Sequence, residues 1–179
     1  IIYETKHQKN SLSIDHLDII NNIKLSFNHD VTSISGSRFS LLFKDIAKLH
    51  RVLGQYMINY HVENNNYIEV YVPLIVSEKS LIGTGQLPKF KDDLFEIKNK
   101  ENSFLIPTAE VPLTNICNNQ IIELHTLPLK FVSLTPCFRS EAGSYGKDTK
   151  GLIRQHQFDK VELVQIAEPS QSNDALNNL

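Results

Sequence analysis

Two strand-like segments separated by a long connection constrain this chain more than any other feature of its sequence. β-Branched and aromatic residues are frequent in 130–141 and again in 156–164, which predicts two strands. The connection between them, 142–155, contains three glycines together with Lys147, Lys150 and Arg154. Hairpin loops usually have two to five residues, so a connection of this length is typical of a functional or a disordered segment.

The two predicted strands each carry polar and aromatic residues at alternate positions. Side chains two residues apart share a face, which puts Arg139 and Glu141 on the same side of the first strand. Four side chains share a face of the second strand: His156, Phe158, Lys160 and Glu162. If the register brings these faces together, the surface suits an anion, a flat base and an ammonium group. The alternative is a solvated hairpin face on which Arg139 pairs with a glutamate across the strands.

This hairpin resembles a known motif. The run F-R-S-E at 138–141, the long glycine-containing loop and the run H-Q-F-D-K-V-E at 156–162 resemble motif 2 of the class II aminoacyl-tRNA synthetases. The order, the spacing and the residue types over about 131–164 are similar to the form found in the seryl-tRNA synthetase family. The resemblance implies an α+β fold in which an antiparallel sheet is flanked by helices.

A second resemblance lies upstream, in 44–73. A stripe of apolar residues predicts a helix over 44–63: Ile46, Leu49, Leu53, Tyr56, Met57 and Tyr60. An apolar strand is predicted for 67–72, and it ends at Pro73 because proline lacks the N–H group that pairing requires. A long helix, a strand and a proline in this order resemble motif 1 of the same family, which implies a twofold homodimer.

The run T-A-E-V-P-L-T at 108–114 has two compatible interpretations. From the residues alone it is a helix entry, with Thr108 as the cap, Glu110 favoured by the helix dipole and Pro112 in the first turn. It also resembles the serine-binding loop of the seryl-tRNA synthetase family. A capped helix end can also hold a ligand, so the two interpretations do not exclude each other.

The resemblance implies a role for each matching residue. Arg139 would hold the α-phosphate of ATP and Glu141 the edge of adenine, and these two are the candidate catalytic residues. Three further residues are assigned to the ATP site, with Phe158 stacking on adenine: Ser140, Gln155 and Phe158. Four residues would contact L-serine: Thr108, Ala109, Glu110 and Glu162. Three basic residues would approach the acceptor end of tRNA(Ser): Lys147, Lys150 and Arg154.

The implied reaction requires no nucleophilic side chain. The carboxylate of serine attacks the α-phosphorus of ATP, pyrophosphate leaves, and the terminal ribose of the tRNA then takes the seryl group. Catalysis of this kind consists of positioning the reactants and neutralising charge, and arginine suits it because its planar fork binds phosphate oxygens bidentately. Mg²⁺ would accompany the phosphates, and we expect none of its protein ligands within this chain.

Composition excludes other classes of function. With 18 basic and 20 acidic residues the net charge is −2, so the chain as a whole has no positive charge that would attract nucleic acid. Any contact with RNA must therefore depend on a local group of basic residues. Cys117 and Cys137 are too few for a disulfide framework and have no zinc-ligand spacing, which favours reduced thiols in a cytoplasmic protein. We find no membrane-spanning run and no signal peptide.

Weaker patterns predict the remaining elements. These are a helix over 13–27 capped by Ser13, a turn over 31–36, a strand over 38–43, a strand over 104–107 after a turn over 98–102, and a helix beginning near Pro169. The octapeptide G-T-G-Q-L-P-K-F at 83–90 marks a turn or a weak phosphate signal. It also resembles a loop near the active site of the seryl-tRNA synthetase family, and we assign it no catalytic role.

The resemblance runs from about residue 15 to residue 179. It implies that 1–22 is the exit from an N-terminal tRNA-binding helical arm and that 23–179 is a partial catalytic domain, truncated before the third motif. We therefore expect these residues alone to be inactive. Two alternatives remain: a homologue that activates an amino acid and loads it onto a carrier protein, and a non-catalytic paralogue used for binding.

Overall fold

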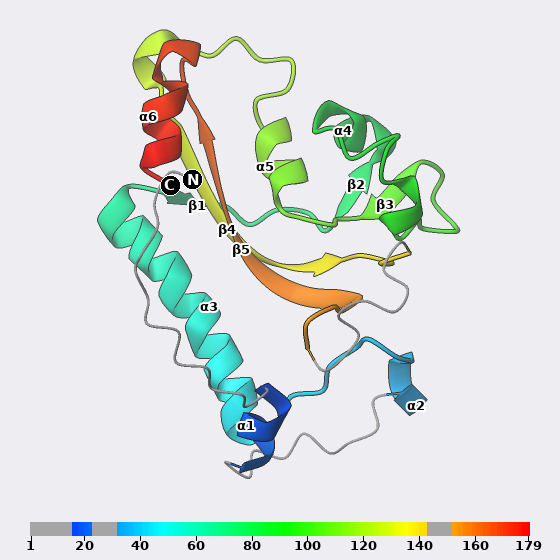
Figure 1. Cartoon of the computed structure of the whole chain (residues 1–179). Helices are drawn as coiled ribbons and strands as arrows, with labels where there is room; N and C mark the ends of the chain where they lie inside the picture. The colour runs from blue at the N-terminus through cyan, green and yellow to red at the C-terminus, as the bar shows by residue number, and fades with distance from the viewer. Residues whose placement is uncertain (1–15, 23–31, 143–151) are drawn as a thin grey trace.

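The computed structural model describes residues 16–22, 32–142 and 152–179, and every structural statement below refers to these ranges (Figure 1). The α-helices are α1 (His16–Asn22), α2 (Thr32–Ser35), α3 (Lys44–Asn65), α4 (Glu78–Gly83), α5 (Glu110–Asn115) and α6 (Ser172–Asn177). The 3₁₀ turns are η1 (Lys91–Asp93), η2 (Leu124–Thr126) and η3 (Pro169–Gln171). The strands are β1 (Ile68–Glu69), β2 (Ile75–Ser77), β3 (Ser103–Leu105), β4 (Leu129–Phe138) and β5 (Gln157–Ile166).

A long antiparallel hairpin, β4–β5, forms the centre of the molecule. Its ladder pairs Leu129 with Ile166 at one end and Phe138 with Gln157 at the other. The short strand β1 adds to β4 in parallel, and β2 and β3 form a separate antiparallel pair. Helices lie beside the hairpin along most of its length, so the α+β prediction of an antiparallel sheet flanked by helices is confirmed (Figure 1).

One face of the hairpin packs against α3. Val132 of β4 is buried together with Ile58 of α3 and Tyr67, and Leu134 packs against the same cluster. α3 approaches closely because Gly54 faces Leu134, where an added Cβ would lie 3.0 Å from a leucine methyl group. The helix therefore packs through Gly54 and Ile58 and leaves its larger apolar residues on the outside.

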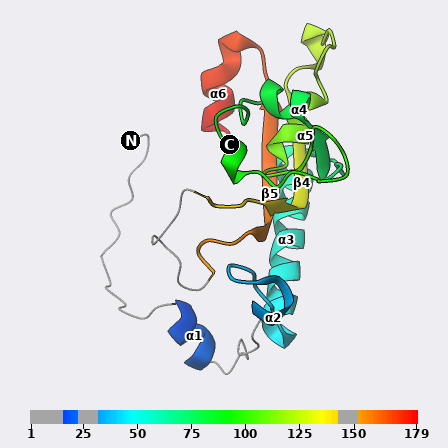
Figure 2. The ribbon, with the colours of Figure 1, turned by 90° about the vertical axis from the view of Figure 1, so that its right-hand side faces the viewer.

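The opposite face of the hairpin packs against α5. Phe131 of β4 is buried with Ala109, Leu113 and Val72, and Val164 of β5 packs against them. Figure 2 places α4 and α5 together in the upper half of the molecule, and both views show α1 and α2 at the opposite end. Because alternate residues face opposite sides, the even-numbered residues of β5 from Phe158 to Ile166 share the α5 side with the odd-numbered residues of β4.

Three strand predictions need correction. The first hairpin strand ends at Phe138 rather than at Glu141, because Glu141 has a left-handed backbone (φ 51°) that cannot continue a ladder. Residues 38–43 form no strand, and Arg38 is left-handed as well (φ 63°). In 67–72 only β1 is a strand, since the chain then leaves β4 and reaches Pro73, which has no N–H to donate.

Most of the other elements agree with the predictions. α3 extends to Asn65 and ends at Asn66, whose left-handed conformation (φ 57°) closes the helix. α5 and the helical turns after Pro169 also lie where the sequence predicts them, and β3 overlaps the strand predicted over 104–107 but runs from Ser103 to Leu105. Of the helix predicted over 13–27, the structure describes α1 alone, and Ser13 lies outside the described residues. Within the described ranges, no helix combines the length and apolar character needed to cross a bilayer.

Candidate active site

Two adjoining cavities open on the α5 side of the hairpin, near the end where β4 stops and β5 begins. The first, of about 410 Å³, lies between the entry to α5 and the hairpin and includes Thr108, Glu110 and Lys160 in its lining. The second, of about 430 Å³, lies over the start of β5 and includes Gln155 and Phe158. Both are lined by Arg139, Glu141 and Arg154, so the cavities meet at these three side chains.

A network of three side chains stands at the first cavity. The buried hydroxyl of Thr108 donates to Glu162 (Oγ1 to Oε2, 2.5 Å) and accepts from the ammonium of Lys160 (2.6 Å) and from the backbone N–H of Glu110 (3.3 Å). Lys160 also forms an ion pair with Glu162. The hydroxyl has one proton to donate and two lone pairs, so its hydrogen-bonding capacity is fully used. The arrangement shows that this hydroxyl and this carboxylate together bind an ammonium group.

Local structure explains why these side chains meet. Phe158, Lys160 and Glu162 are alternate residues of β5 and therefore project from its α5 side in a row. Thr108 reaches the row because Ala109 is fully buried in the cluster between α5 and the hairpin, which anchors the entry to the helix. An aromatic ring, an ammonium and a carboxylate thus follow one another along the site.

Arg139 lies where the two cavities meet. Its Nε donates to the carbonyl of Pro107 (3.2 Å), and its guanidinium carbon lies 5.3 Å from the centre of the Phe158 ring. Both contacts hold the plane of the guanidinium in one orientation. A phosphate group at this position would be within reach of a cation that is already oriented.

The second cavity contains an ion pair between two residues from opposite ends of the long connection. Arg154 donates to Glu141 (Nη1 to Oε2, 2.9 Å), and Arg38 donates to the Glu141 carbonyl (3.3 Å). Gln155 uses its side-chain N–H group to bind the carbonyl of Leu152 (2.9 Å). The carboxylate of Glu141 therefore faces the cavity that also exposes the Phe158 ring.

The structure brings most of the predicted site residues together, with some exceptions. Ser140 lines neither cavity, since its hydroxyl and its amide bind the carbonyls of Asp92 and Asp93. The methyl group of Ala109 is in the core, and Glu162 touches the first cavity only through Thr108 and Lys160. Arg154 lies beside Glu141 in the cleft formed by the two cavities. Lys147 and Lys150 lie outside the described residues.

Sequence reasoning missed other residues of the site. Lys160 was placed on the correct face but was assigned no contact, although its position midway between Phe158 and Glu162 could have indicated one. Gln86 and Phe90, from the octapeptide at 83–90, line the first cavity. Asp93 lines it too, and no local pattern indicates this because its contacts are with residues 140–142.

The described side chains of the site supply charge and hydrogen bonds, and the thiol nearest to them is not an activated nucleophile. Cys137 faces the same side of the sheet, but burial raises the pKa of its thiol, although the nearby Thr135, Lys160 and Arg139 act in the opposite direction. The thiol is therefore neutral at physiological pH and a poor nucleophile. Among the described residues, no three His, Cys, Asp or Glu side chains lie close enough to hold a metal ion.

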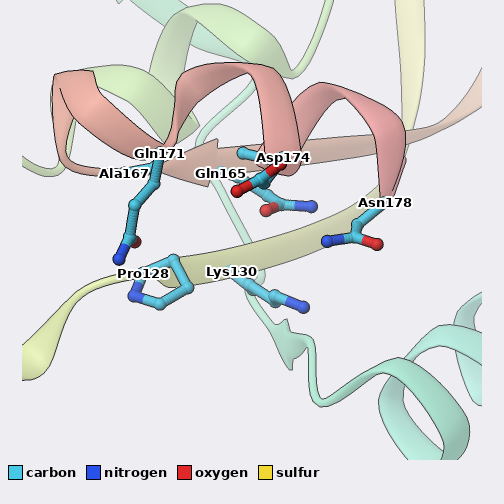
Figure 3. Close-up of a pocket in the computed structure, with 8 residues that line it drawn as sticks. Pro128, Lys130, Gln165, Ala167, Gln171, Asp174 and Asn178 are labelled. Atoms are coloured by element: carbon cyan, nitrogen blue, oxygen red, sulfur yellow. The ribbon is translucent and has the colours of Figure 1, made fainter.

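A further hollow, of about 150 Å³, lies at the other end of the hairpin. Figure 3 shows it between the start of β4, the end of β5 and α6, with Lys130, Gln165 and Asp174 among its lining residues. The ladder separates it from the site by the length of both strands. It has neither the arginine nor the aromatic ring of the two cavities, so we do not include it in the active site.

Comparison with known proteins gives close relatives. Residues 93–179 match the family model of the tRNA synthetase class II core domain (G, H, P, S and T). The chain is 54% identical over 165 residues to a serine–tRNA ligase of Saccharophagus degradans, which covers 92% of this chain and 39% of the relative. It is 53% identical over 178 residues to a serine–tRNA ligase of Nitrosomonas europaea, covering 92% of this chain and 41% of the relative. The chain thus spans about two fifths of the length of these curated relatives.

Solved structures share the fold. The seryl-tRNA synthetase of Pyrococcus horikoshii, complexed with ATP, superposes with a TM-score of 0.83 at 34% identity, over 90% of this chain and 36% of that one. The cytoplasmic serine–tRNA ligase of Naegleria fowleri, in complex with AMP, gives a TM-score of 0.81 at 26% identity, over 91% and 39%. From sequence and fold together, we conclude that residues 93–179 carry a class II tRNA synthetase core domain and that the chain, over 92% of its length, is similar to serine–tRNA ligases.

Proposed function

We propose that this chain supplies the serine- and ATP-binding part of a serine–tRNA ligase. The intact enzyme would activate L-serine with ATP to seryl-adenylate and pass the seryl group to tRNA(Ser). The observation that carries the proposal is the pair of cavities that meet at Arg139, one beside a site that holds an ammonium group and the other lined by a half-buried aromatic ring, Phe158. Two substrates bound in them would present their reacting groups to the same guanidinium.

The first cavity suits a small hydroxy amino acid. The carboxylate of Glu162 can accept further hydrogen bonds, so it would hold the ammonium of serine, with Glu110 adding negative charge at the rim. The ammonium of serine would take the place of Lys160 at the hydroxyl of Thr108, whose other contacts are with Glu162 and Glu110, and the carbonyl of Ala109 would complete the contacts. Lys160 separates Glu162 from Arg139 and would offset the charge of the carboxylates when the site is empty.

The second cavity suits adenine and the α-phosphate. Phe158 would stack on the base, a contact that contributes on the order of 1–3 kcal/mol where aromatic residues bind nucleic acid bases. Glu141 would bind the edge of the base, beside Gln155, and Arg139 would hold the α-phosphate. Mg²⁺ would arrive bound to the phosphates, and the described residues do not fit a metal site, so we assign it no protein ligand.

An exchange assay tests the proposal. We define the chimera as the Saccharophagus degradans ligase in which this chain replaces the matching segment, so that the relative supplies the rest of its own length. We expect the chimera to catalyse serine-dependent ATP–pyrophosphate exchange. We expect no exchange from these 179 residues alone. In an open site the triphosphate of ATP stays hydrated, and the few cations present interact with its negative charges only weakly.

Two outcomes of this assay would favour the alternatives. A folded chimera that binds neither ATP nor serine would indicate a non-catalytic paralogue. A chimera that forms seryl-adenylate but cannot charge tRNA(Ser), although the relative itself can, would favour a homologue that loads a carrier protein. The tRNA would approach from the side of the long connection, where Arg154 lies and where Lys147 and Lys150 occur in the sequence. This role would place the protein in the cytoplasm.

We also propose that the chain forms a homodimer through 44–73. The apolar stripe of α3 is exposed, with Leu49 at 61% and Tyr56 at 62%, because the helix packs on the sheet through Gly54 and Ile58. Ile68 of β1 is exposed as well. A contiguous apolar surface of this kind on a soluble chain is typical of an interface, and twofold symmetry is the commonest arrangement.

Sedimentation of the 179-residue chain tests this dimer. We expect a dimer at roughly tens of micromolar, the range in which an interface of standard size holds. Tyr56→Glu should give monomers, because it places a charge in the middle of the stripe. Leu176→Glu, at a similarly exposed leucine of α6, is the matched control and should remain dimeric. A wild-type chain that sediments as a monomer would count against the proposal.

A further inference from the structure

We propose that Asp93 is a positioning residue, which holds the start of the long connection and thereby fixes the carboxylate of Glu141. Asp93 is the last residue of η1, and no pattern in the sequence indicates a role for it. Its contacts with the hairpin are the observation that carries the inference. Its effect on ATP rests on the proposed function, whereas its effect on the backbone does not.

Asp93 binds the two amides that flank Glu141. The N–H of Ser140 donates to the backbone carbonyl of Asp93 (2.9 Å), and the N–H of Ala142 donates to the side-chain Oδ1 of Asp93 (3.0 Å). One residue therefore holds the chain immediately before and immediately after Glu141. An amide bound to a carboxylate is a charge-assisted hydrogen bond, which is stronger than one between neutral groups.

The backbone between these two amides is strained. Glu141 has φ 51°, a left-handed conformation that residues other than glycine, asparagine and aspartate rarely adopt. In this conformation its carboxylate contacts Arg154 at 2.9 Å and lines both cavities. If the flanking amides were released, Glu141 would relax to a negative φ and its side chain would leave the cleft.

Asp93 can impose this conformation because its own position is rigid. The next residue, Leu94, is buried in the cluster formed with β2, α4 and β3. The carbonyl of Phe95 accepts from Leu105 of β3 (2.9 Å), and the Phe95 ring lies edge-on to the ring of His156 (6.0 Å between centres). Residues 93–95 therefore contact both ends of the long connection, one at Ser140–Ala142 and the other at His156.

The first test measures the backbone of the 179-residue chain and needs no activity. Hydrogen exchange of the Ala142 amide, followed by NMR, should accelerate about 10- to 100-fold in Asp93→Ala, which removes the charged acceptor. Asp93→Asn keeps an oxygen acceptor and should restore most of the protection. Asp92→Ala is the matched control, since it removes the same charge one residue away and leaves the Asp92 carbonyl in place. Hydrogen exchange of the amides in the β4–β5 ladder shows whether a variant also unfolds globally more often than the wild type.

The second test measures the consequence for ATP in the chimera. Asp93→Ala should raise the KM for ATP about 5- to 30-fold while the KM for serine changes little. A change of this size is expected if the substitution destabilises the left-handed conformation of Glu141 by a free energy that is small compared with the stability of the whole protein. Asp93→Asn and Asp92→Ala should resemble the wild type.

Several results would overturn the inference. Unchanged exchange of the Ala142 amide in Asp93→Ala would show that the contact does not hold the backbone. If Asp93→Asn were as impaired as Asp93→Ala, the charge would act on a ligand directly and Asp93 would not be a positioning residue. If Asp93→Ala does not fold, Asp93→Asn alone decides, and it must retain most but not all of the wild-type protection of the Ala142 amide. An inactive wild-type chimera would count against the proposed function. The hydrogen-exchange result for the Ala142 amide would still test whether Asp93 holds the backbone.

Discussion

Glu162→Ala should lower serine-dependent ATP–pyrophosphate exchange by the chimera about 30- to 5,000-fold, which corresponds to the roughly 2–5 kcal/mol that removal of one partner of a buried charge pair costs. The carboxylate accepts from Thr108 and pairs with Lys160. Without it, the ammonium of Lys160 would remain beside Thr108 with no anion to offset it. The ammonium of serine would then meet the ammonium of Lys160 without the carboxylate that pairs with it. The loss should fall on serine, because the two residues that Glu162 contacts, Thr108 and Lys160, line the first cavity and not the second.

The matched control for this substitution is on the same strand. Asp159→Ala removes a carboxylate three residues away, but Asp159 faces the α3 side, where it lies 3.5 Å from His50. It should leave exchange unchanged. Binding of ATP, measured by calorimetry, should be the same in the wild type and in Glu162→Ala. Near wild-type efficiency with serine in Glu162→Ala would show that this residue is wrongly assigned.

Local sequence patterns predicted the elements of the hairpin site well, because the alternation of a strand and the period of a helix depend only on the residues of that segment. The alternation in 156–164 is a consequence of strand geometry, so it indicated which side chains of β5 share a face before the register was known. The helical period of 44–63 located α3 in the same way. Neither pattern could say which stripe of α3 packs on the sheet, because that depends on the fit of Gly54 against Leu134 from a distant strand.

The parts that could not be predicted depend on contacts between distant residues. Thr108 meets Lys160 and Glu162 across 52 and 54 positions of the chain, and no periodicity reports such a pair. Glu141 is not a residue type that favours a left-handed backbone, so the early end of β4 follows from tertiary contacts with Asp93 rather than from propensity. Resemblance to a family supplied Thr108, Glu141 and Glu162 with roles, but their contacts, and any role of Lys160 and Asp93, required the structure.

The position of Arg139 between the two cavities explains why this residue indicated the location of the site so well. It is the first residue after β4, so the ladder fixes its backbone, and Pro107 and Phe158 fix its side chain. It lies between an ammonium-binding network and an aromatic ring and lines both cavities, where the described residues that its side chain contacts are Pro107 and Phe158. In the described part of the chain, Lys160 and Arg154 are each paired with a glutamate.

Arg139→Ala should therefore reduce exchange by the chimera about 10³- to 10⁵-fold, the range found when an arginine that stabilises a transferring phosphoryl group is lost. Negative charge develops on the α-phosphate oxygens as the serine carboxylate attacks, so the loss should appear mainly in kcat and less in the KM for ATP. Arg139→Lys should recover only part of the rate. It keeps the charge but loses the Nε donor to Pro107 and the planar contact with Phe158. Lys79→Ala, which removes an exposed charge from α4, is the control and should leave the rate unchanged. If Arg139→Ala kept its kcat within about tenfold of the wild type, a contribution of roughly 1.4 kcal/mol or less, the guanidinium could not be the group that stabilises the reacting phosphate.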